Sequence, residues 1–566
     1  MNATFTGLHA LDDRLPDWSA EGLAREAAEM RRIRDELRGE LRGDLRDELR
    51  GDLRDKVPHE RREPAATPHP ARLRDDPVLL DSELARANLD VRLAEYDSGF
   101  FHGRNPALWT GEAIFGVVSL LIRDFAPAAK RVPSIRARLE AIPAFLADMR
   151  GTISGAMPAS WSARAVRECE AAQGLFDRGL STWLAQQTLP PNVITDVMES
   201  ATRAREAFAT AARWISGHPV AAGGACAAGE TLFATLLQRG HFCDEPPRAL
   251  LARALEELSR EQAALATLVD AYGGTWETIQ SAMAADHPSV EEYYAAFESR
   301  WRDCRRVAVA HDAVTWEEWP IRYAPIPDWA EEFAPLLYWL FYRSPAPFDP
   351  YTVYEYVVTP IDASLPADVQ EQRLRAWNHS TITLNHVVHH GAVGHHVQNW
   401  HARYRSQSRV GRIAATDCAS RIAMFLGGSL AEGWACYATQ LMEELGMCTP
   451  LERLSEQHTR VRMLARAITD IRLHLDLCTV ADAVTFYREV VGMPEAVAVA
   501  ETTKNSMFPC TAIMYWLGTS RILALREQLR AARGERFVLR EFHDELLSRG
   551  AIPVALAATL MTEPVA

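Results

Sequence analysis

Lysine is nearly absent from this 566-residue chain. Of its 61 basic residues, only Lys56, Lys130 and Lys504 are lysines, which is typical of a coding bias rather than of a function. Acidic residues outnumber basic ones, and the formal net charge is -14. Nucleic acids and anionic membranes attract proteins of the opposite charge. The composition therefore predicts neither a nucleic-acid partner nor a membrane partner.

Paired cysteines and long apolar runs are also missing. The nine cysteines include no C-x-x-C pair, which argues against a disulfide framework and against a cysteine zinc site. The N-terminus has no basic region followed by an apolar run, so we expect no secretory signal. The most apolar run, residues 113–122, is shorter than the roughly 20 residues of a membrane helix. We therefore expect a reduced, cytoplasmic enzyme.

The apolar pattern predicts a mainly α fold. Apolar residues recur every three or four positions through most of residues 78–312, which is the spacing of core-facing helices. Before them, residues 34–55 form a near-repeat of leucine, arginine and acidic residues, and residues 57–77 are rich in proline. We expect an N-terminal helical segment at 1–56, a linker at 57–77 and a helical metal-site domain at 78–566.

Aromatic residues and prolines mix in residues 314–360, where the helical pattern stops. The run 351–359 is the best strand candidate in the chain. Two interpretations stay open. The strand region either closes one end of the core or forms a wall or edge strand of a substrate cleft beside the histidines described next.

Histidine is concentrated in one place. Seven of the 18 histidines fall between His379 and His401. Imidazole is the commonest metal ligand and titrates near neutral pH, so this density indicates a metal or proton-transfer site.

The spacing of these histidines requires a break in the helix. On a regular helix, His389 and His395 point about 120° apart, and His389 and His396 lie about 10 Å apart along the axis. One metal with bonds of roughly 2 Å cannot reach both members of either pair. Gly391 and Gly394 lie where a break is least costly.

Several motifs resemble one known family. HHGAVGHHVQ, from His389 to Gln398, is similar to the H-E-x-x-P-G-H-H-x-Q signature of the bacterial domain-of-unknown-function family 885, a helical, zinc-metallopeptidase-like family. SLAEGWACYATQLMEELG resembles its V-E-G-W-A-x-Y-A-E segment. Further similarity covers GLHALDDRLPDWS, NPALWTGEAIFGVVSLLIRDFAP, FPCTAIMYWLG and REFHDELLSRGAIP. The resemblance thus spans nearly the whole chain except the insert at 34–76.

The resemblance implies a metal held by histidines of the central stretch and by Glu432. The candidate ligands are His389, His395 or His396, and Glu432, a set that leaves an open position for water or substrate. The resemblance also places Tyr515 near the metal, where its hydroxyl could position substrate or donate to an oxyanion.

The departures from the motif put ordinary peptidase chemistry in question. His390 stands where the family has the glutamate that takes a proton from metal-bound water. Either His390 is itself the base, or His390 and His474 join the ligand set, with Asp470 orienting His474. A third interpretation is an inactive hydrolase kept as a binding protein, but the site has gained histidines rather than lost them.

We therefore expect a metal-dependent enzyme that hydrolyses a small amide or peptide-like substrate, with His390 as candidate base. The expected cofactor is a divalent metal, zinc first, with iron or two metals as alternatives. The alternative functions are non-hydrolytic oxidative or lyase chemistry and a metal-free interaction protein. The expected partner is a small-molecule or peptide-like substrate, and the sequence leaves the oligomeric state open.

Overall fold

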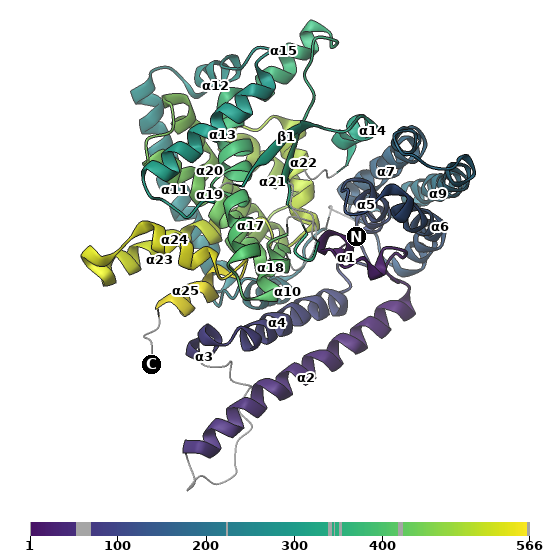
Figure 1. The fold of residues 1–566 in the computed structure, drawn as a ribbon, viewed down its shortest axis with the longest axis horizontal. Helices are drawn as coiled ribbons and strands as arrows, with labels where there is room; N and C mark the ends of the chain where they lie inside the picture. The colour runs from purple at the N-terminus through teal and green to yellow at the C-terminus, as the bar shows by residue number, and fades with distance from the viewer. Residues whose placement is uncertain are drawn as a thin grey trace.

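The structure is a computed structural model that describes residues 2–52, 70–221, 225–317, 319–337, 342–344, 346–349, 354–416 and 423–562. Helices account for most of these residues, and the predicted mainly α fold is confirmed. Figure 1 shows two groups of helices, with α5, α6, α7 and α9 on one side and α11, α13, α19 and α20 on the other.

The first half of the described chain contains the helices α1 (Asn2–Thr6), η1 (His9–Leu11), α2 (Ala20–Asp52), α3 (Pro70–Asp75), α4 (Pro77–Ser98), α5 (Pro106–Leu121), α6 (Ala128–Thr152), α7 (Ala159–Gly174), η2 (Leu175–Gly179), α8 (Leu180–Ala185), α9 (Pro191–Gly217), α10 (Glu230–Gly240), α11 (Pro247–Tyr272), α12 (Trp276–Ala285) and α13 (Tyr293–Ala310).

The second half contains α14 (Asp328–Glu331), η4 (Ala334–Leu336), α15 (Ala367–Ala376), α16 (His379–Thr381), η5 (Ile382–Gly391), α17 (His395–Tyr404), α18 (Arg409–Ala414), η6 (Ala423–Gly427), α19 (Gly428–Glu444), α20 (Pro450–His474), α21 (Val480–Val491), α22 (Glu495–Met507), α23 (Met514–Arg533), η7 (Gly534–Arg536), α24 (Leu539–Leu547) and α25 (Val554–Thr562).

A small sheet forms in the aromatic region. Its strands are β1 (Ile321–Pro325), β2 (Tyr342–Arg343) and β3 (Tyr354–Val358), in the order β1-β3-β2. β3 runs parallel to β1 and antiparallel to β2, and all five of its residues are buried. The predicted strand therefore exists, but it is the central strand and not an edge. Residues 351–353 of the predicted run lie outside the described part of the chain.

Two large hydrophobic cores hold the helices together. One core contains Trp161 of α7 and Ile468 of α20. The other contains Val387 of η5 and Trp434 of α19. Burial of apolar surface on this scale is the main stabilising force of the fold. The helices α19 and α20 thus face different cores, and the candidate site described below lies between them.

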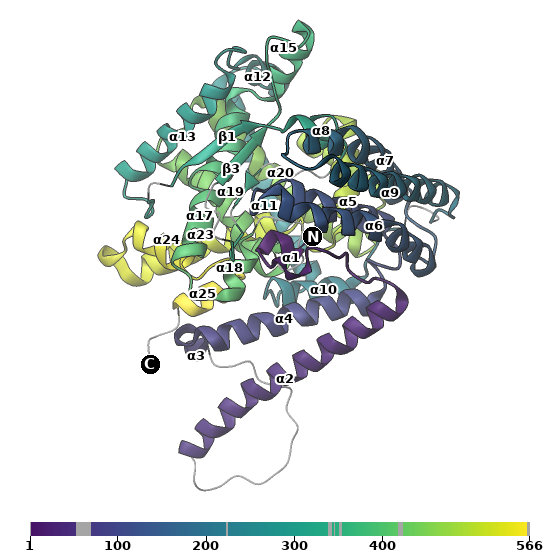
Figure 2. The ribbon, with the colours of Figure 1, turned by 45° about the vertical axis from the view of Figure 1, so that its right-hand side comes forward.

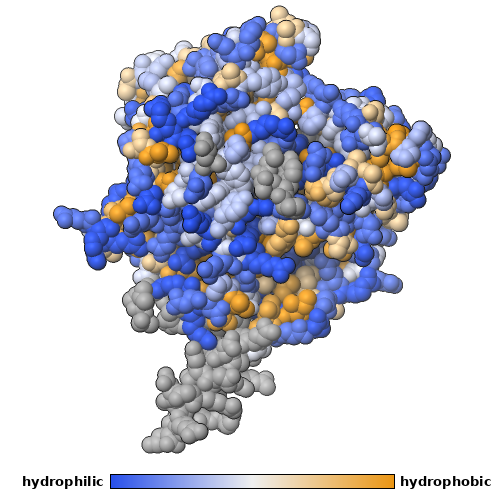
Figure 3. Space-filling view, in the orientation of Figure 1, coloured by the Kyte–Doolittle hydropathy of each residue, from blue (hydrophilic) through white to orange (hydrophobic). Residues whose placement is uncertain are grey.

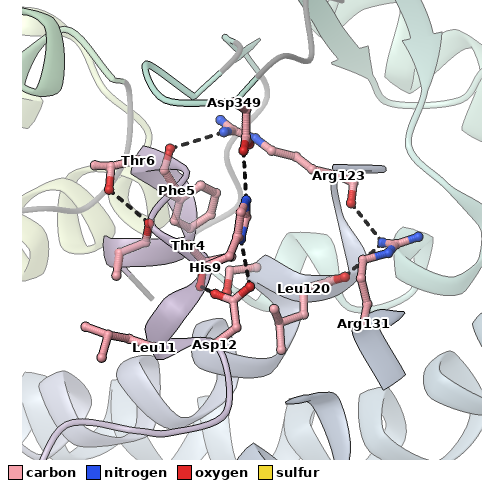
Figure 4. A network of polar contacts seen from close by, with 12 residues as sticks. Thr4, Phe5, Thr6, His9, Leu11, Asp12, Leu120, Arg123, Arg131 and Asp349 are labelled. Atoms are coloured by element: carbon pink, nitrogen blue, oxygen red, sulfur yellow. Dashed lines mark hydrogen bonds and ion pairs between the residues drawn. The ribbon is translucent and has the colours of Figure 1, made fainter. Parts of the chain in front are cut away.

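The N-terminal residues are part of the body. Figure 4 shows His9 between two carboxylates, with Nδ1 2.7 Å from Asp12 and Nε2 2.8 Å from Asp349. The buried Arg138 of α6 donates to the hydroxyl of Thr4 over 2.9 Å. This network joins the first turns of the chain to α6 and to the segment before β3.

The described part of the predicted N-terminal segment is helical, and so is the end of the predicted linker. Helix α2 continues through the leucine and arginine repeat and runs beside α4, as Figures 1 and 2 both show. Of the predicted linker at 57–77, residues 57–69 lie outside the described part, and residues 70–75 form the helix α3. Arg74 of α3 donates to the carbonyl of Leu560, so this part of the expected linker packs on the C-terminal helix α25.

The visible surface is mostly hydrophilic. On the face in Figure 3, the apolar side chains of the described residues form small, separate groups. Among the helices that the structure describes, none is both long and apolar enough to span a bilayer.

Candidate metal centre

The histidine stretch forms two helical segments separated by a break. The π-helix η5 ends at Gly391, and α17 begins at His395. Between them, Ala392 leaves the helical region with φ -130° and ψ -120°. The amide of Gly394 donates to the carbonyl of Val388 over 2.9 Å, which closes a wide turn. The predicted break between His389 and His395 is confirmed.

Glycine is required at the end of this break. A Cβ atom on Gly394 would lie 1.9 Å from the carbonyl oxygen of His389, far inside van der Waals contact. The carbonyls that the break removes from helical pairing accept hydrogen bonds from indoles. Trp301 donates to Gly391 over 2.8 Å, and Trp434 donates to Val393 over 2.8 Å. Indole donors therefore satisfy the Gly391 and Val393 carbonyls at the break, as buried backbone groups require.

The break brings three imidazoles together. One ring nitrogen from each of His389, His390 and His395 lies within 4.8 Å of the others. Glu432 of α19 faces two of these rings, with Oε2 3.4 Å from Nε2 of His389 and 3.6 Å from Nε2 of His395. Two ligand atoms that each bind one metal ion at about 2.1 Å can be at most about 4.2 Å apart. A small inward movement of the rings would therefore allow their nitrogens to bind the same ion.

Close packing of two helices positions Glu432. The next residue, Gly433, meets Gly518 of α23, and a Cβ atom on Gly433 would lie 2.5 Å from the Cα of Gly518. The following Trp434 is fully buried and reaches the break. The E-G-W segment therefore sets both the position of the carboxylate and the geometry of the histidine segments.

The electrostatics of the group favour the neutral forms of His389 and His390 and the ionised form of Glu432. Burial lowers the pKa of His389, and it lowers the pKa of His390 well below 6.5 with help from His389 and His395. Burial alone would raise the pKa of Glu432, but the facing rings of His389 and His395 hold that pKa well below its usual range. Neutral imidazole and ionised carboxylate are the forms that bind metals.

A hydrogen bond outside the group fixes the tautomer of His390. Its Nδ1 lies 2.6 Å from the backbone carbonyl of Asn385, which can only accept. Nδ1 therefore carries the proton in the neutral ring, and Nε2 carries a lone pair. Such outer hydrogen bonds are typical of metal-binding histidines and of histidines that act as bases.

His396 points away from the group. Its Nε2 lies 2.8 Å from the carbonyl oxygen of Trp319, and its ring packs edge-on against Tyr354 of β3. The sequence left His395 and His396 as alternatives, and the structure brings only His395 to Glu432.

His474 is also remote from the group, which corrects the expectation that it joins the ligand set. Its Nε2 lies 2.9 Å from the carbonyl oxygen of Asn505, and its buried ring stacks on Phe233 in the core. Asp470 lies 3.7 Å from the His474 ring and accepts from the amides of Cys510 and Ile513 instead, each over 3.0 Å. His474 therefore packs in the core, and Asp470 binds backbone amides just before the start of α23.

The group opens into a cavity of about 720 Å³ between η5, α19, α20 and α22. Tyr356 of β3 also lines this cavity, and its hydroxyl oxygen lies 2.5 Å from Nδ1 of His386. This contact favours the interpretation of β3 as a wall of the cavity. Tyr515 lines the cavity as well, and its ring lies beneath the guanidinium of Arg466, 5.0 Å from the ring centroid to Cζ.

Sequence reasoning missed the charged side chains that share this cavity: Glu456, Arg462, Arg466, Glu501 and Lys504. Arg462 and Arg466 are four residues apart, and arginines at this spacing are typical of a solvent-exposed helix face. The one feature of the sequence that set any of these five residues apart was the rarity of lysine, since Lys504 is one of three lysines in the chain.

The residues present fit a divalent metal. Glu432 Oε2 is buried, and its contacts with the rings of His389 and His395, at 3.4 and 3.6 Å, are longer than ordinary hydrogen bonds. A cation between these groups would stabilise the buried, ionised carboxylate. Imidazole nitrogens with one carboxylate are a donor set that zinc and iron share.

Comparisons with known proteins agree with the fold. A family model described as "Bacterial protein of unknown function (DUF885)" matches residues 1–561. Comparison with curated proteins gives no match. The chain is similar to the solved structure of a putative lipoprotein of unknown function from Shewanella oneidensis, with a TM-score of 0.73 and 19% identity over 99% of this chain and 96% of that one.

A second solved structure, a putative lipoprotein from Colwellia psychrerythraea, has a TM-score of 0.73 and 17% identity over 99% of this chain and 94% of that one. Lipoproteins are anchored to a membrane outside the cytoplasm. The sequence-based expectation of a cytoplasmic protein is therefore contradicted by the descriptions of both structures.

Proposed function

We propose that this chain, which belongs to the DUF885 family, is a metal-dependent hydrolase of a small amide or peptide-like substrate. The observation that carries the proposal is the position of Glu432. Its carboxylate faces His389 and His395 at 3.4 and 3.6 Å, at the wall of a cavity large enough for a small substrate.

His389, His395 and Glu432 would hold the metal, with zinc as the first candidate. When bound, such a metal acts as a Lewis acid and lowers the pKa of water. His390 stands beside this set and presents the lone pair of Nε2, so it is the candidate proton acceptor. Its Nδ1 keeps its proton and donates it in a hydrogen bond to the Asn385 carbonyl oxygen, which holds the ring in one orientation.

Tyr515 is the candidate donor to the substrate. It lines the same cavity, and a phenol in that position can donate to the oxygen of a substrate carbonyl as negative charge develops there. The guanidinium of Arg466 lies over the Tyr515 ring. Its positive charge favours the development of negative charge near the Tyr515 hydroxyl.

One observation favours a second candidate function. The three imidazoles of His389, His390 and His395 lie together, so His390 can also serve as a third nitrogen ligand. A set of three imidazoles and one carboxylate suits iron or two metals, and hence oxidative or lyase chemistry.

The variant His390→Gln separates the two functions. If His390 is the base, the variant keeps its metal and loses roughly a hundredfold or more in hydrolysis of a panel of dipeptides and N-acyl amino acids. If His390 is a ligand, the metal content falls in parallel with activity. His390→Glu supplies the carboxylate of the resembled motif and is expected to support peptide hydrolysis. Failure of the metal-loaded wild type and of His390→Glu to hydrolyse any panel member would contradict the hydrolase.

A further inference from the structure

We infer that Arg462, Arg466 and Lys504 form a subsite for a carboxylate group of the substrate. This inference rests on the proposed function and narrows its substrate class to amide or peptide-like compounds with a free carboxylate.

Two helices build this subsite. Arg462 and Arg466 are one turn apart on α20 and line the cavity, and α22 brings Glu501 and Lys504 to the same cavity. Arg466 pairs with Glu501 through two contacts, Nε to Oε1 at 2.7 Å and Nη2 to Oε2 at 2.9 Å. Arg462 reaches only 3.7 Å from the same carboxylate. Glu501 is thus already engaged in a two-pronged pair with Arg466.

The charges of this group do not balance. Arg462 and Arg466 share one ionised carboxylate. Burial alone would raise the pKa of Glu501, but Arg466, with Arg462 and Lys504, lowers it to about 2. Glu456 also lines the cavity, but burial raises its pKa to about 7, and its nearest cation is Arg460 at 3.5 Å.

Arg462 is less closely paired with Glu501 than Arg466 is. The neighbouring charge of Arg466, followed by burial, lowers the pKa of Arg462. Its Nε atom is buried and makes no hydrogen bond within the described residues. A guanidinium presents a planar fork of donors that matches a carboxylate with two parallel hydrogen bonds. An anionic ligand would satisfy the free donors and offset the charge.

The subsite lies within reach of the candidate metal centre. Arg462 and Arg466 line the same cavity as His389 and His395. A small substrate can therefore place its carboxylate at Arg462 while its amide bond lies at the histidines.

Binding of N-acetyl-leucine to the full chain, measured by titration calorimetry, tests this inference. We expect the wild type to bind N-acetyl-leucine roughly tenfold or more tightly than its methyl ester, and more tightly than inorganic phosphate. Arg462→Gln should lose that preference, and Arg462→Lys should keep most of it. The matched control Arg453→Gln, at an exposed position on the same helix, should bind like the wild type.

The experiment separates this inference from the proposed function. Glu432→Gln should lose metal but retain the preference for the carboxylate over the ester. Equal binding of acid and ester by the wild type would overturn the subsite, as would unchanged binding by a folded Arg462→Gln. Tighter binding of phosphate than of N-acetyl-leucine would overturn the assignment to carboxylates. Absence of binding by either N-acetyl-leucine or its ester would also overturn it.

Discussion

The indole nitrogen of Trp434 lies 2.8 Å from the carbonyl oxygen of Val393 and 3.2 Å from that of Gly394. Helix α19, which carries Glu432, is thereby tied to the break that turns His389 and His395 toward each other. The carboxylate and the two imidazoles therefore keep their relative positions through one buried side chain.

Replacing this indole tests its role. Trp434→Phe keeps an aromatic ring but removes the indole donor of the Val393 carbonyl, whereas the Gly394 carbonyl still accepts from the amide of Gln398. Loss of the buried donor costs about 1–3 kcal/mol of unfolding free energy. We also expect weaker metal binding, because the break loses its tie to α19. Urea denaturation and metal titration measure the two effects. The control is Trp400→Phe on α17, at a half-buried position, and equal losses in both variants would contradict this role for Trp434.

Gly394→Ala should be among the most damaging small substitutions in the chain. The new Cβ atom would overlap the carbonyl of His389, so the break must open and the histidine group with it. We expect a loss of several kcal/mol in stability, on the scale of severe core mutations, or loss of metal binding in a folded variant. Gly151→Ala on α6 is the control, because nothing lies within 4 Å of its Cβ position. Wild-type stability and metal content in Gly394→Ala would refute the account of the break.

The contacts of His9 predict a pH dependence of stability. Burial alone would lower the pKa of His9, but its hydrogen bonds to Asp349 and Asp12 raise it above 6.5. Because the folded-state pKa is raised, the contribution is fully present below the unfolded value of about 6.5 and is lost as pH rises through the folded-state value.

His9→Gln should therefore cost more stability at about pH 5.5 than at about pH 8.5, by up to roughly 1 kcal/mol for a half-buried pair. Urea unfolding of both proteins at the two pH values measures the difference. A loss independent of pH would show that His9 acts through packing on Phe125 rather than through charge.

The fold was predictable where local pattern determines structure. Apolar residues at three- and four-residue spacing predicted the helices, and the rise per residue of a helix predicted the break between His389 and His395. Gly391 and Gly394 were expected to lie where a break is least costly, and a Cβ atom on Gly394 would meet the His389 carbonyl there. These inferences depend only on residues that are close in sequence.

The rest of the site depends on contacts between distant segments. Sequence spacing could not show that His396 turns to Trp319 or that His474 stacks in the core, because both partners come from other parts of the chain. It also could not show that Arg462 and Arg466 face a cavity, since the same spacing is common on solvated helices. The helix α3 within the predicted linker was equally hidden, because it packs on α25, which is distant in sequence.

The central claim is that His389, His395 and Glu432 bind a metal, and elemental analysis tests it most directly. The full chain should be purified without added metal beside Glu432→Gln and the control Glu199→Gln, which removes an exposed carboxylate on α9. We predict about one zinc per chain in the wild type and the control, and little or none in Glu432→Gln. Iron, or two metals per chain, would favour the second candidate function. No bound metal in the wild type, or an unchanged metal content in Glu432→Gln, would contradict the account.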